Sequence, residues 1–200
     1  AARRKELRCS RQLQLIMFTA LSAISAHADS AFGIEYGGEL PSGSEDIGDG
    51  YFFVASPPKP HTLFETYAVI HTAETGVCMI SAISTKFEND KYGTKAKSAY
   101  DKLVVSLDKK YGPEGDMWET LKADALWDEA DEFAMSLVKG DRNHARWFLP
   151  SADSQNEFDY VQIRIGAENS SRTYIVLDYS NKVLKENCTA VLSSADNDSL

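Results

Sequence analysis

The stretch F-E-T-Y-A-V-I-H-T-A-E-T-G-V-C-M-I-S-A-I-S, residues 64–84, decides the fold. Two runs rich in β-branched and aromatic residues, Phe64–His71 and Gly76–Ser84, flank the short polar segment Thr72–Thr75. Apolar runs of this length around a short polar connection predict a β-hairpin. We therefore expect two antiparallel strands joined as a hairpin.

Further segments on both sides of this hairpin also have the composition of strands. They are Ala31–Tyr36, Tyr51–Ala55, His144–Leu149, Phe158–Ile165 and Thr173–Tyr179. Between residues 158 and 165 the chain alternates Val161, Ile163 and Ile165 with Tyr160, Gln162 and Arg164. This alternation predicts a strand with one buried face. We expect residues 167–172 to form the turn that leads to the last strand.

The middle of the chain has helical periodicity. Thr94–Tyr111 carries an apolar stripe, basic residues in its last turn and a Gly-Pro stop directly after it. We expect a second helical region over Asp116–Val138, broken near Leu126–Asp128. A third helix is expected over Asn181–Ser194. Strands in local hairpins, two central helices and a C-terminal helix predict an α+β fold with a mainly antiparallel sheet.

Two segments in the N-terminal part of the chain have an unusual composition. Residues 1–28 combine a basic head, the apolar run Leu13–Ile24 and an Ala-His-Ala cleavage pattern, which is typical of a secretory signal peptide. We expect a single domain over residues 29–200. Within it, residues 37–50 are rich in Gly and acids, and we expect them to form a flexible acidic loop. The expected location is periplasmic or secreted.

Charge narrows the classes of partner. Residues 29–200 hold 16 Lys and Arg against 29 Asp and Glu, a formal net charge of −13 with His neutral. This balance argues against nucleic acid and against an anionic membrane surface. It favours a basic protein partner, such as a basic envelope protein. The alternative is that the acidity serves solubility alone.

Two cysteines remain once the signal is removed, Cys78 and Cys188. In an oxidising compartment such a pair predicts a disulfide, and the alternative is two buried free thiols. Within strand 76–84, Cys78 alternates with Ile80 and Ala82, so we expect all three to point toward the core.

Patterns that carry catalysis are missing from the sequence. It has no G-x-S-x-G elbow, no H-E-x-x-H, and no glycine-rich phosphate loop. His61, His71 and His144 are scattered along the chain. We therefore expect no catalytic residues, no metal site and no cofactor.

The residues left as candidates for partner binding are Glu45, Asp46, Asp49, His61, Trp127 and Trp147. The first three lie in the acidic loop, His61 follows a proline-rich segment, and tryptophans are common anchors at interfaces. Three functions stay open. The chain is a non-catalytic binding protein that binds or inhibits a basic envelope protein, a cell-envelope hydrolase with carboxylates near Trp127 and Trp147, or a structural subunit of an envelope assembly.

Several spaced motifs resemble those of a group of uncharacterised secreted bacterial proteins. They are F-G-I at Phe32–Ile34, P-K-P-H at Pro58–His61 followed by Phe64, G-x-C at Gly76–Cys78, Tyr92-Gly93, Lys110-Tyr111-Gly112, Trp127 and Cys188. The chain is also distantly similar to small inhibitor-like α+β modules of the cell envelope, from which it departs at residues 37–50. The resemblance implies a fold style and a compartment, and it implies no catalytic residues.

Overall fold

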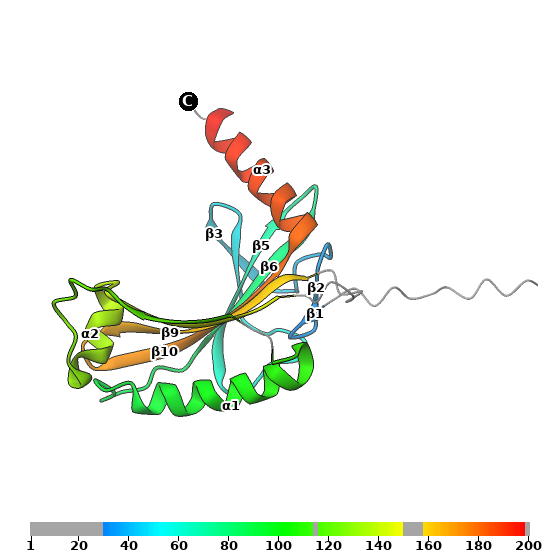
Figure 1. Ribbon diagram of the computed structural model, residues 1–200. Helices are drawn as coiled ribbons and strands as arrows, with labels where there is room; N and C mark the ends of the chain where they lie inside the picture. Colours follow the sequence, from blue (N-terminus) through cyan, green and yellow to red (C-terminus); the bar gives the residue numbers. More distant parts are fainter. Residues whose placement is uncertain (1–29, 114–115, 150–157, 199–200) are drawn as a thin grey trace, which may run out of the picture.

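The fold, seen in a computed structural model that describes residues 30–113, 116–149 and 158–198, is α+β (Figure 1). Eight strands form one antiparallel sheet in the order β3-β4-β5-β6-β10-β9-β8-β7. These strands are β3 (Ser44–Gly48), β4 (Tyr51–Val54), β5 (Phe64–Thr72), β6 (Gly76–Ser84), β7 (Asp116–Leu121), β8 (Arg142–Phe148), β9 (Phe158–Asn169) and β10 (Arg172–Asn181). The predicted fold class and the predicted hairpin over residues 64–84 are confirmed, and the hairpin lies inside the sheet.

Three α-helices accompany the sheet. Their bounds are α1 (Thr94–Tyr111), α2 (Phe133–Val138), which follows a 3-10 turn over Ala130–Glu132, and α3 (Lys182–Asp198). Helix α1 has the predicted bounds and lies along one side of the sheet, whereas α3 rises from the opposite side (Figure 1). The signal-peptide prediction falls on residues outside the described part of the chain.

The core lies between α1 and the sheet. The predicted alternation in β9 is confirmed, because Val161, Ile163 and Ile165 are fully or almost fully buried. Tyr100 and Leu107 of α1 join them in one apolar cluster. Burial of these side chains supplies most of the drive to fold, and it leaves the alternate residues of each strand on the other face of the sheet.

Two predictions about local structure are wrong. Ser44–Gly48, expected to be part of a loop, pairs with β4 as strand β3, because backbone hydrogen bonds need no apolar side chains. Asp116–Leu121, expected to be helical, is the strand β7, which pairs with β8 alone among the described strands. All six of its residues are exposed. A helix at this place would need a buried apolar stripe to hold it against the core, and this segment buries none of its side chains.

Smaller differences occur at two turns. The expected strand over Ala31–Tyr36 is a two-stranded hairpin of β1 (Ser30–Ala31) and β2 (Ile34–Glu35). Phe32 and Gly33 both have positive φ, and this tight turn separates the two strands. Strand β9 extends to Asn169, so the β9–β10 turn is shorter than predicted.

Candidate functional site

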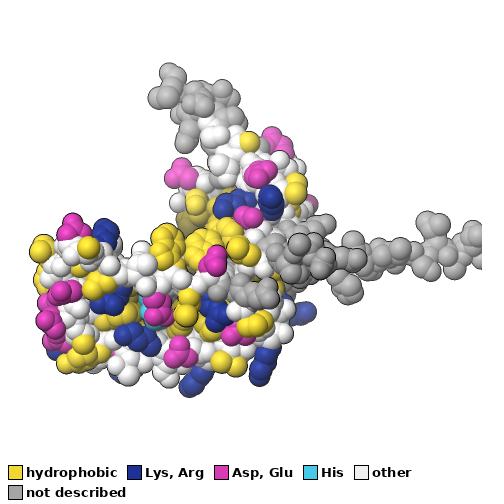
Figure 2. Space-filling model, in the orientation of Figure 1, with side chains coloured by type: hydrophobic (Ala, Val, Ile, Leu, Met, Phe, Trp, Pro, Cys, Tyr) yellow, Lys and Arg dark blue, Asp and Glu magenta, His cyan; other side chains and the backbone are white. Residues whose placement is uncertain are grey.

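The face of the sheet opposite α1 is the candidate functional surface, and we call it the open face. It is defined by half-exposed side chains that alternate with the core residues, namely Trp147, Tyr160, Gln162, Arg164 and Tyr174. Of the two long helices α1 and α3, only α3 lies on this side (Figure 1). Figure 2 shows hydrophobic side chains gathered between the base of α3 and the end of the sheet that carries α2. An aromatic surface that the described helices leave partly uncovered is typical of a binding face.

Aromatic rings on the open face are held in place by their neighbours. Trp147 and Tyr160 pack edge to face with ring centroids 4.8 Å apart, and Lys185 of α3 places its Nζ 4.7 Å from the centre of the Tyr160 ring. Tyr174 pairs with Gly166 across β9 and β10. A Cβ at Gly166 would lie 2.6 Å from the Tyr174 ring, so the absence of a side chain lets this ring lie against the sheet. Rigid aromatic side chains bind partners at little cost in entropy.

A polar group lies among these rings. Asp178 is buried, and its Oδ1 accepts a 2.6 Å hydrogen bond from the Ser81 hydroxyl. Its Oδ2 lies 3.6 Å from Nε of Arg164, whose side chain is 43% exposed. The guanidinium is therefore anchored at one side and open to solvent at the other. It offers a directional donor in the middle of an otherwise aromatic surface.

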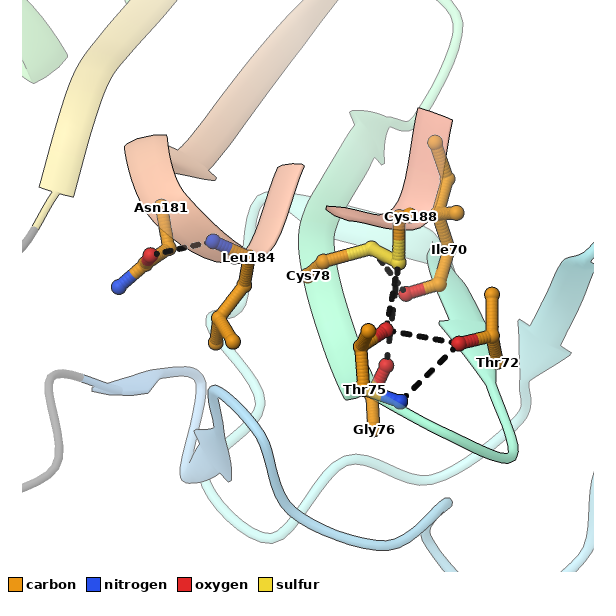
Figure 3. The surroundings of a disulfide bond; sticks show 8 residues. All are labelled: Ile70, Thr72, Thr75, Gly76, Cys78, Asn181, Leu184 and Cys188. Atoms are coloured by element: carbon orange, nitrogen blue, oxygen red, sulfur yellow. Dashed lines mark hydrogen bonds between the residues drawn. A yellow bond between two sulfur atoms is a disulfide. The ribbon is translucent and has the colours of Figure 1, made fainter. Parts of the chain in front are cut away.

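Helix α3 forms a wall at one end of the open face. The register of β5 and β6 pairs Ile70 with Met79 and His71 with Val77, so Cys78 is an extra residue at a β-bulge. Cys78 forms a disulfide with Cys188 of α3, as predicted (Figure 3). Cys78 is buried as expected. Because of the bulge, however, its side chain points toward α3 and does not share the face of Ile80 and Ala82.

Polar contacts around the disulfide fix the start of α3 and the turn beneath it (Figure 3). Asn181 caps the helix, because its Oδ1 accepts a 3.1 Å hydrogen bond from the Leu184 N–H. The hydroxyl of Thr75 lies 3.1 Å from Sγ of Cys188 and 2.7 Å from the hydroxyl of Thr72. The covalent bond and these contacts position α3 relative to the β5–β6 hairpin.

A cleft of about 370 Å³ lies between α3 and the sheet. Tyr51, Ile70 and Met79 line it from the sheet, and Lys185 and Thr189 line it from the helix. Tyr51 is 45% exposed, so its ring borders the mouth of the cleft. This cleft has the apolar floor and polar rim of a protein-binding site.

A second cleft of about 290 Å³ opens at the far end of the same face. Strands β8 and β9 pair only between Ala145 and Phe148 on β8, and the cleft forms beyond Ala145 on the α2 side. Trp118, Gln162 and Arg164 are among its lining residues. The open face therefore has a recess at each end.

The acidic residues predicted to bind a partner lie on the β3–β4 hairpin. Glu45 and Asp46 are exposed on β3, and Asp49 lies in the turn with a φ of 53°. Glu45 pairs with Phe53, and both Phe53 and Tyr51 lie on the open-face side of β4. None of the three carboxylates forms an ion pair with a residue in the described ranges. The hairpin therefore gives this edge of the face an unneutralised negative charge.

The other predicted residues are not brought together with this hairpin. Trp147 lies on β8, which is separated from β3 by five strands. Trp127 is half-buried in the segment between β7 and the 3-10 turn. His61 is exposed on the α1 side, where its ring packs against Phe64 at 5.4 Å and its Nδ1 accepts a 3.2 Å hydrogen bond from the Leu63 N–H. The predicted set thus marks several places rather than one site.

His144 is the histidine with the most distinctive environment. Its ring packs 4.7 Å from that of Tyr100, and its Nε2 lies 3.4 Å from Oε1 of Glu119. Burial lowers the pKa of His144 below the usual 6.5, although Glu119 acts in the opposite direction. Burial also raises the pKa of Tyr100. Both groups are therefore held neutral inside the fold at neutral pH.

Carboxylates do not converge in the clefts described above. Neither cleft on the open face is lined by Asp or Glu, and within residues 30–113, 116–149 and 158–198 no group of three or more His, Cys, Asp or Glu is placed to hold a metal ion. Comparison with protein-family models, curated proteins and solved structures finds no match. The resemblance to secreted bacterial proteins stays a prediction. None of the helices in the described ranges is long and apolar enough to cross a membrane.

Proposed function

We propose that the chain is a non-catalytic binding protein of the periplasm or the extracellular space, and that it binds a basic protein through the open face and the β3–β4 hairpin. The observation that carries the proposal is the open face itself. It presents Trp147, Tyr160 and Tyr174 half-exposed and held in place, with a recess at each end. Interfaces of this kind use aromatic anchors that are surrounded by polar groups.

The basic character of the partner rests on charge complementarity. Glu45 lies on the open-face side of the edge strand β3, and it, Asp46 and Asp49 give the β3–β4 hairpin three carboxylates without cationic partners among the described residues. The whole chain carries a formal net charge of −9 at pH 7, so a basic protein is attracted before contact. The same charge repels nucleic acid. A basic envelope protein, such as a hydrolase that the chain inhibits, fits this pattern.

A carboxylate hydrolase is the less favoured alternative. Glycosidase chemistry needs two carboxylates across one cleft, and neither cleft on the open face is lined by an acid. The carboxylate of the buried Asp178 accepts a hydrogen bond from Ser81 and forms an ion pair with Arg164. These features support binding rather than turnover.

The disulfide supports a location outside the cytoplasm. A bond between Cys78 and Cys188 persists in oxidising compartments and is rare in the cytosol. N-terminal sequencing of the exported protein would show a start near Asp29 if residues 1–28 are removed as a signal. Retention of those residues on a cytoplasmic protein would contradict the proposed location.

The charge contribution is tested by neutralising the hairpin without changing its shape. The variant combines Glu45→Gln, Asp46→Asn and Asp49→Asn, because the Asn at 46 keeps the oxygen that accepts the 2.8 Å hydrogen bond from the Gly48 N–H. The partner is first isolated from a periplasmic extract on the immobilised protein, and its affinity is then measured with both components pure. We expect about tenfold weaker binding and a smaller salt dependence.

A matched variant removes three charges from exposed sites elsewhere, with Asp101→Asn, Asp124→Asn and Asp128→Asn. We expect its affinity to match that of the parent protein. Equal weakening by both triple variants would mean that only the net charge matters, and it would remove the hairpin from the interface. An acidic or uncharged partner would contradict the proposal.

The aromatic contribution is tested at two tryptophans of similar burial. Trp147→Ala removes a ring of the open face, whereas Trp127→Ala removes a half-buried ring between β7 and the 3-10 turn. We expect Trp147→Ala to weaken partner binding at least tenfold and Trp127→Ala to leave it unchanged. The reverse order would place the interface at the other end of the molecule. Circular dichroism checks that both variants are folded.

A further inference from the structure

A groove of about 650 Å³ lies on the α1 side of the molecule, away from the open face. Its floor consists of Leu63, Phe87, Ala99 and Leu103, which are half-buried and pack against the hydrophobic core. Its volume is in the range of small-molecule sites. The groove therefore extends from the solvent to the core.

The helical wall of the groove follows from the spacing of residues on α1. Lys95, Ala99 and Ser106 lie on one stripe of this helix and line the groove. The short side chains of Ala99 and Ser106 leave room that larger residues would fill. Over the eleven residue steps from Lys95 to Ser106, a rise of 1.5 Å per residue gives a length of about 16 Å. The groove is thus elongated along the helix axis.

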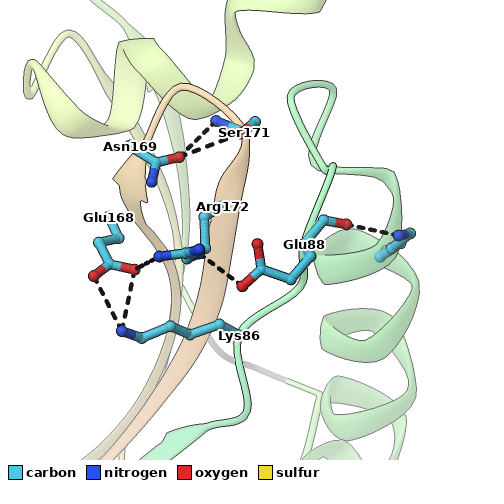
Figure 4. A network of polar contacts seen from close by, with 7 residues as sticks. Lys86, Glu88, Glu168, Asn169, Ser171 and Arg172 are labelled. Carbon is cyan, nitrogen blue, oxygen red and sulfur yellow. Dashed lines mark hydrogen bonds and ion pairs between the residues drawn. The ribbon is translucent and has the colours of Figure 1, made fainter.

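The opposite wall is fixed by a network of ion pairs (Figure 4). Arg172 bridges Glu88, at 2.7 Å from Nε, and Glu168, at 3.0 Å from Nη1. Lys86 lies 3.1 Å from the same Glu168 carboxylate. Phe87, between the two tied residues, also forms a backbone bridge to β10. Its ring is therefore held as a preformed part of the groove, which reduces the entropy cost of binding a ligand.

The rim of the groove is positively charged although the protein is acidic. Lys95 and Lys102 line the groove, and no carboxylate does. Lys95 donates a 2.7 Å hydrogen bond to the Glu88 carbonyl, whereas the ammonium group of Lys102 pairs with no carboxylate in the described ranges. Figure 2 shows Lys and Arg side chains along the edge that α1 forms, with Asp and Glu side chains among them. A free cation thus lies beside an apolar floor.

We infer that this groove binds a free single-chain anionic amphiphile, with the alkyl chain on the apolar floor and the anionic head at Lys102. Removal of the alkyl chain from water onto the apolar floor favours binding, and the anionic head forms a charge-assisted hydrogen bond with the ammonium group of Lys102. The formal net charge of −9 repels an anionic bilayer, so the charge favours a monomeric ligand over a membrane surface. This inference does not rest on the proposed function, since the groove and the open face lie on opposite sides of the sheet.

The test uses laurate, the twelve-carbon fatty acid, as ligand, at concentrations where it is monomeric. Laurate displaces the fluorescent probe anilinonaphthalene sulfonate from the purified, disulfide-bonded protein, and calorimetry gives its affinity. We expect binding in the micromolar range, and monolaurin, which has the same chain without the charge, should bind about tenfold more weakly. Lys102→Gln should weaken laurate binding about tenfold and leave monolaurin binding unchanged.

Two further variants separate the groove from other sites. Ser98→Trp places a large side chain on the exposed helical wall of the groove and should abolish binding of both ligands. Lys109→Gln removes an exposed charge from the same helix outside the groove and should have no effect. Laurate binding that survives Ser98→Trp, or equal losses in Lys102→Gln and Lys109→Gln, would overturn the inference.

A membrane surface is distinguished by a separate measurement. Vesicles of phosphatidylglycerol are sedimented with the protein, and the same three variants are compared. Binding to vesicles without binding to monomeric laurate would overturn the inference in favour of a lipid surface. Binding to laurate but not to vesicles would support it.

Discussion

Asp90 and Thr173, which lie 83 residues apart in the sequence, are joined by a 2.6 Å hydrogen bond from the Thr173 hydroxyl to Oδ2 of Asp90. The same carboxylate accepts hydrogen bonds from the N–H groups of Lys95, at 2.9 Å, and Ala96, at 3.1 Å. Helix α1 has Gly93 at its N-cap and no side-chain cap there. Asp90 therefore satisfies the first N–H groups of α1 and ties the helix to β10.

Replacing Asp90 with Asn tests this anchor. The substitution removes a buried charge that accepts three hydrogen bonds at the positive end of a helix. We expect the free energy of unfolding to fall by about 2–3 kcal/mol in urea titrations. Asp101→Asn, an exposed change on the same helix, should alter it by less than about 0.5 kcal/mol.

Additivity provides a second check on the same pair. Thr173→Val removes the hydroxyl at nearly constant volume. If the two groups form one unit, the variant that combines Asp90→Asn with Thr173→Val should lose less unfolding free energy than the sum of the losses in the two single variants. Strict additivity would mean that Asp90 acts through the helix alone.

Gly93 and Gly140 form a matched pair for a test of close packing. Both have positive φ, of 70° and 69°. A Cβ on Gly93 would lie 2.2 Å from Cδ1 of Phe133, whereas a Cβ on Gly140 meets nothing within 4 Å. We expect Gly140→Ala to cost about 1 kcal/mol for its backbone alone, and Gly93→Ala to cost at least about 2 kcal/mol more. Thermal unfolding of the two variants gives the comparison, and equal losses would contradict the packing argument.

Loss of the disulfide should lower the stability of the whole protein and loosen the attachment of α3. The bond joins residues separated by 110 positions, so the loop-entropy relation predicts that Cys78→Ala with Cys188→Ala lowers the unfolding free energy by about 4–5 kcal/mol. Hydrogen exchange should also rise more in α3 than in α1, because Cys188 attaches α3 to the sheet. Alkylation and mass measurement of the native protein should find neither thiol free.

Protonation of His144 should destabilise the protein in mild acid. Its pKa is lowered in the folded state, so the unfolded chain binds more protons once the pH falls below about 6.5. Stability is then full above that pH and is lost as the pH falls toward the lower folded pKa. Urea titrations between about pH 7.5 and about pH 5.5 should show this slope. His144→Phe should reduce the slope, and an equal slope in this variant would contradict the assignment to His144.

Sequence patterns were sufficient where side-chain burial follows a simple period. Helix α1, the β5–β6 hairpin and the alternation in β9 were all predicted because each buries one face. The predictions for β3 and β7 were wrong, because the residues of these strands are mostly or wholly exposed. Edge strands of this kind are held by backbone hydrogen bonds, which leave no apolar period in the sequence.

The candidate site could be predicted only in part. The Cys78–Cys188 pair followed from counting, and the alternation in β9 already placed Tyr160 and Arg164 on one side of a strand. That this side is open depends on where α1 and α3 pack. The position of α3 depends in turn on a bulge at Cys78 that no local pattern indicates. Long-range placement, rather than residue type, was the missing information.

The two outermost strands of the sheet carry a further consequence. Among the described strands, β3 and β7 each have only one neighbour, so each presents unpaired backbone groups along its outer side. Exposed acids lie on both, Glu45 and Asp46 on one and Asp116 and Glu119 on the other. Two copies that approach edge to edge would bring like charges together at the distance where strands pair. The acidity of these strands therefore opposes edge-to-edge aggregation, and it does so most strongly in the dilute salt where the charges are least screened.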